Sequence, residues 1–105
     1  MNILFVCSRN KWRSATAETI FKNHPLHQVK SAGTSAAARI KINVKHIDWA
    51  DLIFVMEKKH KLILAENFKE EIAEKETIIL NIPDDYQYMD EELIEELETK
   101  VGGYL

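Results

Sequence analysis

Short apolar runs alternate with amphipathic stretches along the chain. Four of these runs are rich in β-branched and aromatic residues, a composition typical of β-strands; they lie at residues 2–6, 28–32, 52–56 and 77–80. The run at 52–56 is continuous and uncharged, as in a strand that is buried on both faces of a parallel sheet. The sequence therefore predicts four short strands.

The intervening stretches predict helices. Ala17, Ile20 and Phe21 share the spacing of one helix face, so a helix is expected, with its N-terminal cap at Arg13 or Ser14 and its end near 23–25. Two further helices are predicted, one over 58–75 and one that Asp90 caps and Gly102 follows. The pattern between Thr34 and Trp49 is poor; within it 36–38 is expected to open a helix and 44–50 to form one turn of another.

Strands that alternate with helices imply right-handed crossovers and a parallel sheet. We predict an α/β fold, a single small doubly wound domain over residues 1–105, with a four-stranded parallel sheet of order 2-1-3-4 flanked by helices. In such sheets a ligand binds beyond the carboxyl ends of the strands, near the switch in strand order. The loop after the first strand, residues 7–13, is therefore the expected site.

Composition narrows the class of protein. Hydrophobic residues make up 46% of the 105-residue chain and charged residues 30%, which is typical of a globular domain. One cysteine allows no internal disulfide, and no segment has the pattern of a signal peptide or a membrane span, so a cytoplasmic location is expected. The net charge of −3 gives no general attraction to nucleic acid or to an anionic membrane, and neither is an expected partner.

The loop after the first strand carries the candidate chemistry. Cys7 ends the strand and Arg13 stands six positions later, at the mouth of a helix. A loop of this length can turn its N–H groups inward, and the helix adds its positive end, which together make an anion site. Such a site stabilises a thiolate nucleophile, Arg13 offers paired donors to phosphoryl oxygens, and the Ser14 hydroxyl is placed to donate to the sulfur. The alternative is that Cys7 is a small buried apolar residue.

These residues resemble a known signature. Ile3-Leu4-Phe5-Val6-Cys7, followed by Asn10, Arg13-Ser14 and Ala17-Glu18, is similar to the signature of the low-molecular-weight protein-tyrosine phosphatases. The resemblance continues over nearly the whole chain, in the segments 31–34, 50–57 and 82–86. It implies the doubly wound fold predicted above.

The resemblance also implies a mechanism without metal or other cofactor. Cys7 attacks phosphorus to form a phosphocysteine, while Arg13 holds the equatorial oxygens. A late aspartic acid protonates the leaving phenolate and then activates water. The family's Asp-Pro-aromatic segment aligns with 84–86, so Asp84 is the expected acid and the neighbouring Asp85 is the alternative; a solvated turn after Pro83 remains the non-catalytic interpretation.

The remaining site residues follow from the same resemblance. Asn10 is expected in a left-handed conformation, which asparagine tolerates, and Ser31 is placed to hydrogen-bond it from the neighbouring strand. Ser31 and Asp85 are expected to support the site. The residues expected to bind substrate are Ser8, Arg9, Asn10, Lys11, Trp12, Ser14 and Tyr86.

Several positions depart from the family's pattern. Arg9 replaces a usual glycine, Trp12 a frequent second cysteine and Ala15 a frequent proline, and the chain is shorter than its relatives between Thr34 and Ala50, a region that helps to wall the substrate cleft. The four histidines lack the companions of a metal site, so no metal is expected. His46 and His60 are expected at the surface.

Together these observations predict a metal-independent phosphomonoester hydrolase that acts on phosphotyrosine. Its partners would be phosphorylated proteins or small phosphomonoesters, with inorganic phosphate and vanadate as inhibitors. Two alternatives remain open. One is an arsenate reductase that uses an external thiol, since Cys7 has no second cysteine to form a relay. The other is a regulatory module that binds phosphate without turnover.

Overall fold

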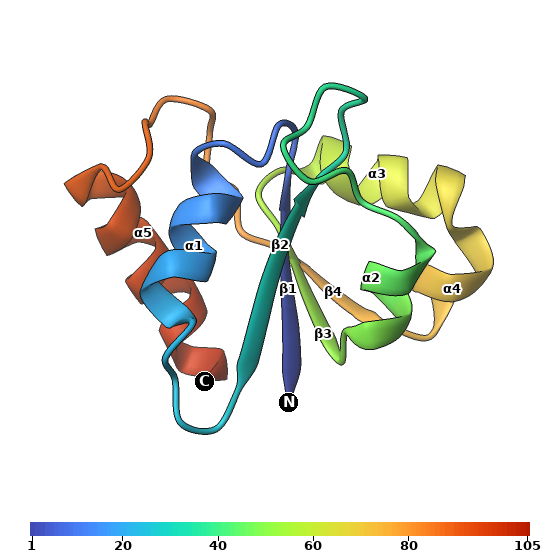
Figure 1. Cartoon of the computed structure of the whole chain (residues 1–105), viewed down its shortest axis with the longest axis horizontal. Helices are drawn as coiled ribbons and strands as arrows, with labels where there is room; N and C mark the ends of the chain where they lie inside the picture. Colours follow the sequence, from blue (N-terminus) through green and yellow to red (C-terminus); the bar gives the residue numbers. More distant parts are fainter.

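Four parallel strands form one sheet in the computed structural model, which describes all residues from 1 to 105 (Figure 1). They are β1 (Asn2–Cys7), β2 (Gln28–Gly33), β3 (Leu52–Val55) and β4 (Glu76–Ile79). The sheet order is β2-β1-β3-β4, and every neighbouring pair is parallel. This confirms the predicted α/β fold and its 2-1-3-4 order.

Helices cover both faces of the sheet, as a doubly wound fold requires (Figure 1). Helices α1 (Arg13–Phe21) and α5 (Glu91–Val101) lie on one face. Helices α2 (Val44–Trp49), α3 (Lys58–Asn67) and α4 (Lys69–Ala73) lie on the other, and a short 3₁₀ turn, η1 (Gly102–Tyr104), follows α5. No helix is long and apolar enough to cross a membrane.

The alternation of side chains along β1 produces two cores. Ile3, Phe5 and Cys7 face α1 and α5, where they pack with buried residues that include Leu93 and Leu97. Leu4 and Val6 face the other layer and pack with a second group: Ala32, Ile42, Ile47, Ala50, Ile53, Val55 and Leu64. Both faces of β1 are therefore packed, which holds the strand in place between the two helix layers. Its carboxyl end carries Cys7 at one edge of the sheet.

Three expected elements differ from the structure. The helix predicted over 58–75 is broken at Phe68, whose φ of −133° and ψ of 43° end α3 and begin α4. The break allows Phe68 and Ile72 to pack against the second core. At its start, α1 is capped by Trp12 without a side-chain hydrogen bond, rather than by Arg13 or Ser14.

The segment 36–38 does not open a helix. A turn after Ser35 takes its place, in which the Ala38 amide donates to the Ser35 carbonyl at 3.0 Å and the Ala37 amide to Ser35 Oγ at 3.1 Å. The backbone amides of Thr34, Ser35 and Arg39 donate to the loop after β1, as described below. These hydrogen bonds compete with those of a helix.

Gly33 ends β2 at a point where two loops touch. A Cβ atom at this position would lie 2.5 Å from the Ser8 carbonyl oxygen and 2.7 Å from Ala38 Cβ. The former contact is with backbone, which cannot move aside without shifting the loop after β1. Glycine is therefore required here by space.

We expect Gly33→Ala to lower the free energy of unfolding by about 1–3 kcal/mol, because the added methyl group overpacks the contact between the loops. Urea unfolding measures the change. Gly103→Ala is the matched control, since nothing lies within 4 Å of its added Cβ. Equal stability of Gly33→Ala and the wild-type protein would contradict this packing.

Candidate active site

The loop after β1 turns its first four carbonyl groups away from its own interior. Each carbonyl accepts a hydrogen bond from the segment after β2: Cys7 from the Thr34 amide (2.9 Å), Ser8 from the Ser35 amide (2.8 Å), Arg9 from the Arg39 amide (2.9 Å) and Asn10 from Arg39 Nε (3.0 Å). In a trans peptide the N–H points opposite to the C=O. The amides that follow these carbonyls therefore face inward.

A buried chain of polar groups fixes the middle of this loop. Asn10 is fully buried and has a φ of 58°, as predicted. Its Nδ2 donates to Ser31 Oγ at 2.9 Å and to Ser14 Oγ at 2.7 Å, which confirms the predicted contact between Asn10 and Ser31. The Ser31 hydroxyl in turn donates to Glu18. Asn10 therefore tethers the loop to β2 and α1.

The same chain ends on the sulfur of Cys7. Ser14 Oγ lies 2.9 Å from Cys7 Sγ and already accepts from Asn10, so its own hydrogen is free to point at the sulfur. The backbone N–H of Asn10 also donates to Sγ, at 3.2 Å. Two donors thus converge on the sulfur of Cys7.

A cavity of about 140 Å³ opens above the sulfur. Its lining contains six residues of the loop and one from the segment after β4: Cys7, Ser8, Arg9, Lys11, Trp12, Arg13 and Asp84. Four of the lining residues are charged: Arg9, Lys11 and Arg13 are cations, and Asp84 is an anion. The cavity is therefore suited to a small anion.

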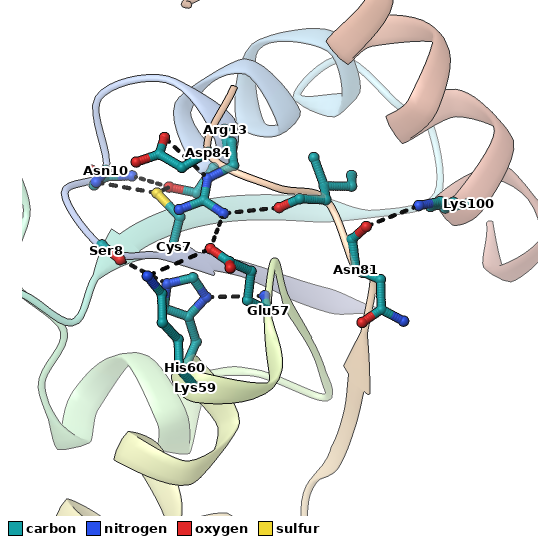
Figure 2. Close-up of polar contacts among 12 residues, drawn as sticks. Cys7, Ser8, Asn10, Arg13, Glu57, Lys59, His60, Asn81, Asp84 and Lys100 are labelled. Carbon is teal, nitrogen blue, oxygen red and sulfur yellow. Dashed lines mark hydrogen bonds and ion pairs between the residues drawn. The ribbon is translucent and has the colours of Figure 1, made fainter. Parts of the chain in front are cut away.

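Arg13 is almost completely buried and is oriented by two carbonyl or carboxylate acceptors (Figure 2). Its Nη1 donates to Glu57 Oε2 at 2.5 Å and to the Ile82 carbonyl at 2.8 Å. Nε lies 3.7 Å from Asp84 Oδ1, and Nη2 has no hydrogen-bond partner in the protein. The edge formed by Nε and Nη2 is thus left for a ligand, and this is the edge that binds two oxygens of a phosphoryl group.

Glu57 is a site residue that the sequence interpretation missed. Burial alone would raise its pKa, but the hydrogen bond and positive charge of Arg13 outweigh this effect and hold the pKa of the Glu57 carboxyl below its usual value. It therefore stays ionised and keeps Arg13 in place. The signal was its position two residues after β3, at the same sheet edge as Cys7.

His60 was expected at the surface, and this expectation was wrong. Its side chain is fully buried in the first turn of α3, with Nε2 2.8 Å from Ser8 Oγ (Figure 2). Burial, reinforced by the charge of Arg13, lowers the pKa of His60 to about 4. The ring is therefore neutral near pH 7 and lies directly beneath the cavity lining.

Not all of the predicted site residues reach the cavity. Asn10 and Ser14 are buried behind the loop and contact the sulfur instead of the open space. Asp85 is exposed and does not line the cavity. Tyr86 lines a separate hollow on α5 with Glu92, Glu95, Glu96 and Thr99; partial burial and the carboxylates of Glu96 and Glu92 raise the pKa of its phenol.

The departures at Arg9 and in the shortened region are accommodated by the backbone. The residues with positive φ are Asn10, Asn81 and Met89, so Arg9 needs no glycine-like conformation. The segment 34–39 holds the loop's carbonyls rather than lining the cavity. The wall of the cavity is supplied by residues of the loop after β1 and by Asp84. No group of three or more His, Cys, Asp or Glu side chains is arranged to hold a metal ion.

Comparison with known proteins finds that part of the chain is similar to a known phosphatase family. Residues 2–48 match the low molecular weight phosphotyrosine protein phosphatases. The protein-arginine-phosphatase of Geobacillus stearothermophilus is 33% identical over 65% of this chain and 62% of its own. The match thus spans under two thirds of that relative's length.

Solved structures agree with the fold. The YwlE arginine phosphatase from Geobacillus stearothermophilus is 25% identical with a TM-score of 0.69, over 98% of this chain and 94% of its own. The tyrosine phosphatase Wzb from Escherichia coli K30, solved in complex with phosphate, is 23% identical with a TM-score of 0.79, over 98% and 94% of the two chains. The chain thus shares the fold of these solved phosphatases, and its first 48 residues carry the family match.

We expect the free energy of unfolding to fall by about 2–3 kcal/mol as the pH is lowered from about 6.5 to about 4, because in this window the unfolded chain protonates His60 and the folded protein does not. The stabilisation is complete above this window. His60→Gln should therefore flatten the profile, measured by urea unfolding across this range.

A smaller slope should remain in that variant, because partial burial and Lys30 also lower the pKa of His46. His24→Gln, outside the cavity, controls for the loss of a histidine. A His60→Gln profile as steep as that of the wild-type protein would contradict a neutral His60.

Proposed function

We propose that this protein is a metal-independent phosphomonoester hydrolase that acts on phosphotyrosine in proteins. The observation that carries the proposal is the convergence in one small cavity of the Cys7 sulfur, the free edge of Arg13 and the inward amides of their loop. Sulfur is the nucleophile, and the cations and N–H groups neutralise the phosphoryl oxygens as charge spreads in the transition state.

In the first step the Cys7 thiolate attacks phosphorus. The S–P bond forms as the P–O bond to the phenol breaks, and Arg13 follows the equatorial oxygens with Nε and Nη2. Ser14, which donates to the sulfur, stabilises the thiolate before attack and again when it departs.

Asp84 is proposed as the general acid of this step. It is the one carboxylic acid that lines the cavity, and its side chain is 55% exposed, so it reaches both solvent and the leaving oxygen. Its proton passes to the phenolate as the P–O bond breaks. In the second step the Asp84 carboxylate takes a proton from water, the oxygen attacks phosphorus, the S–P bond breaks and phosphate leaves.

Trp12 favours an aromatic substrate. It lines the cavity and remains 42% exposed, so its ring is available at the mouth to pack against a phenyl group. The single cysteine favours a reducing compartment, and we extend the proposal to cytoplasmic phosphoproteins.

A second substrate, phosphoarginine in proteins, is favoured by a different observation. The curated relative with 33% identity is a protein-arginine-phosphatase. The same cradle would hold its phosphoryl group, and Asp84 would protonate the leaving guanidine nitrogen. Matched peptides carrying phosphotyrosine or phosphoarginine distinguish the two; a kcat/KM at least tenfold higher for phosphoarginine would replace the first substrate by the second.

We expect the wild-type protein to hydrolyse p-nitrophenyl phosphate and a phosphotyrosine peptide in the presence of a metal chelator. Cys7→Ser should reduce kcat to background, because a serine hydroxyl in this site lacks a base to activate it. Arg13→Lys should reduce kcat/KM at least a hundredfold, because a point charge cannot reproduce the paired donors. Released phosphate measures each rate.

Other outcomes identify other functions. Undiminished turnover in Cys7→Ser would rule out the phosphocysteine. Binding of phosphate without any turnover would indicate a regulatory module, and arsenate reduction that needs an added thiol would indicate a reductase.

We expect Asp84→Asn to lower kcat for phenyl phosphate at least tenfold more than for p-nitrophenyl phosphate, because a poor leaving group needs the proton more. Asp85→Asn, one residue away and outside the cavity, is the matched control and should change kcat for neither substrate strongly. The reverse ranking would assign the acid to Asp85.

A further inference from the structure

Ser8 and His60 form a pair that the proposed mechanism does not use. Ser8 lines the cavity beside Cys7, and its Oγ has one hydrogen-bond partner in the protein, His60 Nε2 at 2.8 Å. His60 is fully buried and contributes nothing to the cavity surface itself. His60 therefore makes no direct contact with a ligand, and its hydrogen bond to a residue of the cavity lining is the one to Ser8.

The hydrogen bonds determine which ring nitrogen of His60 carries the proton. The Glu57 amide donates to Nδ1 at 3.0 Å, and an amide can only donate. Nδ1 is therefore the unprotonated acceptor, and in the neutral ring the hydrogen lies on Nε2. It follows that Nε2–H donates to Ser8 Oγ.

This direction fixes the role of the serine. A hydroxyl has one hydrogen, and a hydroxyl that accepts from His60 keeps that hydrogen for another acceptor. The protein supplies none, while the cavity beside Ser8 is the proposed phosphate site. If His60 accepted instead, the Ser8 hydrogen would be used inside the protein and its oxygen lone pairs would face an anion.

We propose that His60 is a positioning residue that holds the Ser8 hydroxyl as a hydrogen-bond donor to a phosphoryl oxygen in the cavity. The proposal rests on the phosphate site of the proposed function. It adds the Ser8 hydroxyl to the backbone amides and Arg13 as a donor to phosphate, with the hydroxyl oriented by the hydrogen bond from His60.

A capping role alone does not account for His60, and His46 shows why. Both residues occupy the third position of a helix and accept from the amide of the N-cap residue through Nδ1, His60 at 3.0 Å and His46 at 3.1 Å. His46 Nε2 has no partner, whereas His60 Nε2 contacts Ser8. The two histidines thus share the cap and differ in the link to the cavity.

The test is the affinity for inorganic phosphate, measured by calorimetry at pH 7 without turnover. Ser8→Ala and His60→Leu should each weaken phosphate binding about tenfold to a hundredfold, the loss of one hydrogen bond to a charged group. The double variant should be no weaker than either single variant. His60→Gln, whose amide can accept from Glu57 and donate to Ser8, should stay within about twofold of the wild-type protein.

His46→Leu is the matched control, because it removes the equivalent cap from α2, and its phosphate affinity should be unchanged. Additive losses in the double variant, or an unchanged affinity in Ser8→Ala, would overturn the proposal. Absence of phosphate binding by the wild-type protein would overturn it too. Phosphate binding without hydrolysis would refute the proposed function. The affinities of the two single variants and the double variant would still decide whether His60 acts through Ser8.

A measurement on the wild-type protein covers the case in which His60→Leu fails to fold. The ¹⁵N shifts of the His60 ring should report the Nε2–H tautomer from pH 8 to pH 5. The charged groups that act on this ring are Arg13, Glu57, Lys59 and Asp84. A neutral ring protonated on Nδ1 at pH 7 would reverse the direction of the bond to Ser8, and a ring charged at pH 6 could not accept from the Glu57 amide through Nδ1. Either result would overturn the proposal.

Discussion

The outward rotation of four successive carbonyl groups is the constraint on which the rest of this site depends. A loop of seven residues between a strand and a helix has no internal reason to turn every N–H the same way. Here the segment after β2 provides the reason, because its amides and Arg39 bind each carbonyl from outside. The close approach that this needs is possible because Gly33 has no side chain. Once the carbonyls are held, the inward amides and the anion site follow.

Arg13 depends on a second set of contacts, which come from other strands. Glu57 follows β3, and the Ile82 carbonyl and Asp84 follow β4. The Ile82 amide is in turn bound to the Met56 carbonyl, and the Asn81 carbonyl accepts from Lys100 of α5 (Figure 2). The guanidinium is thus placed by the carboxyl edge of the whole sheet, and this explains how a small domain keeps it almost completely buried without losing an edge for a ligand.

The sequence was sufficient to predict the strands and the first loop, because these depend on local pattern. The strand order was predicted from the doubly wound topology that alternating strands and helices imply. A continuous apolar run marks β1, and the spacing of Cys7 and Arg13 fits one strand–loop–helix unit. The left-handed Asn10 and its bond to Ser31 were predicted through the family resemblance, and asparagine is one of the few residues that tolerate this conformation. The family resemblance added Asp84, which local pattern alone would have left as a turn residue.

What the sequence did not show is set by packing between distant segments. His60 stands among lysines and looks like a surface residue, yet the first turn of α3 directs it inward beneath Ser8. Phe68 interrupts a pattern that is helical on both sides, because the core is better filled with a break there. Tyr86 is near Asp84 in sequence but lies against α5. Each depends on which surface a side chain meets, and periodicity does not contain that information.

A crystal structure of the protein with vanadate tests the central arrangement most directly. We expect vanadium bonded to Cys7 Sγ, with its equatorial oxygens within hydrogen-bond distance of the amides of residues 8–13 and of Arg13 Nε and Nη2. Vanadate bound elsewhere, or loop carbonyls turned into the cavity around it, would contradict this arrangement of the site.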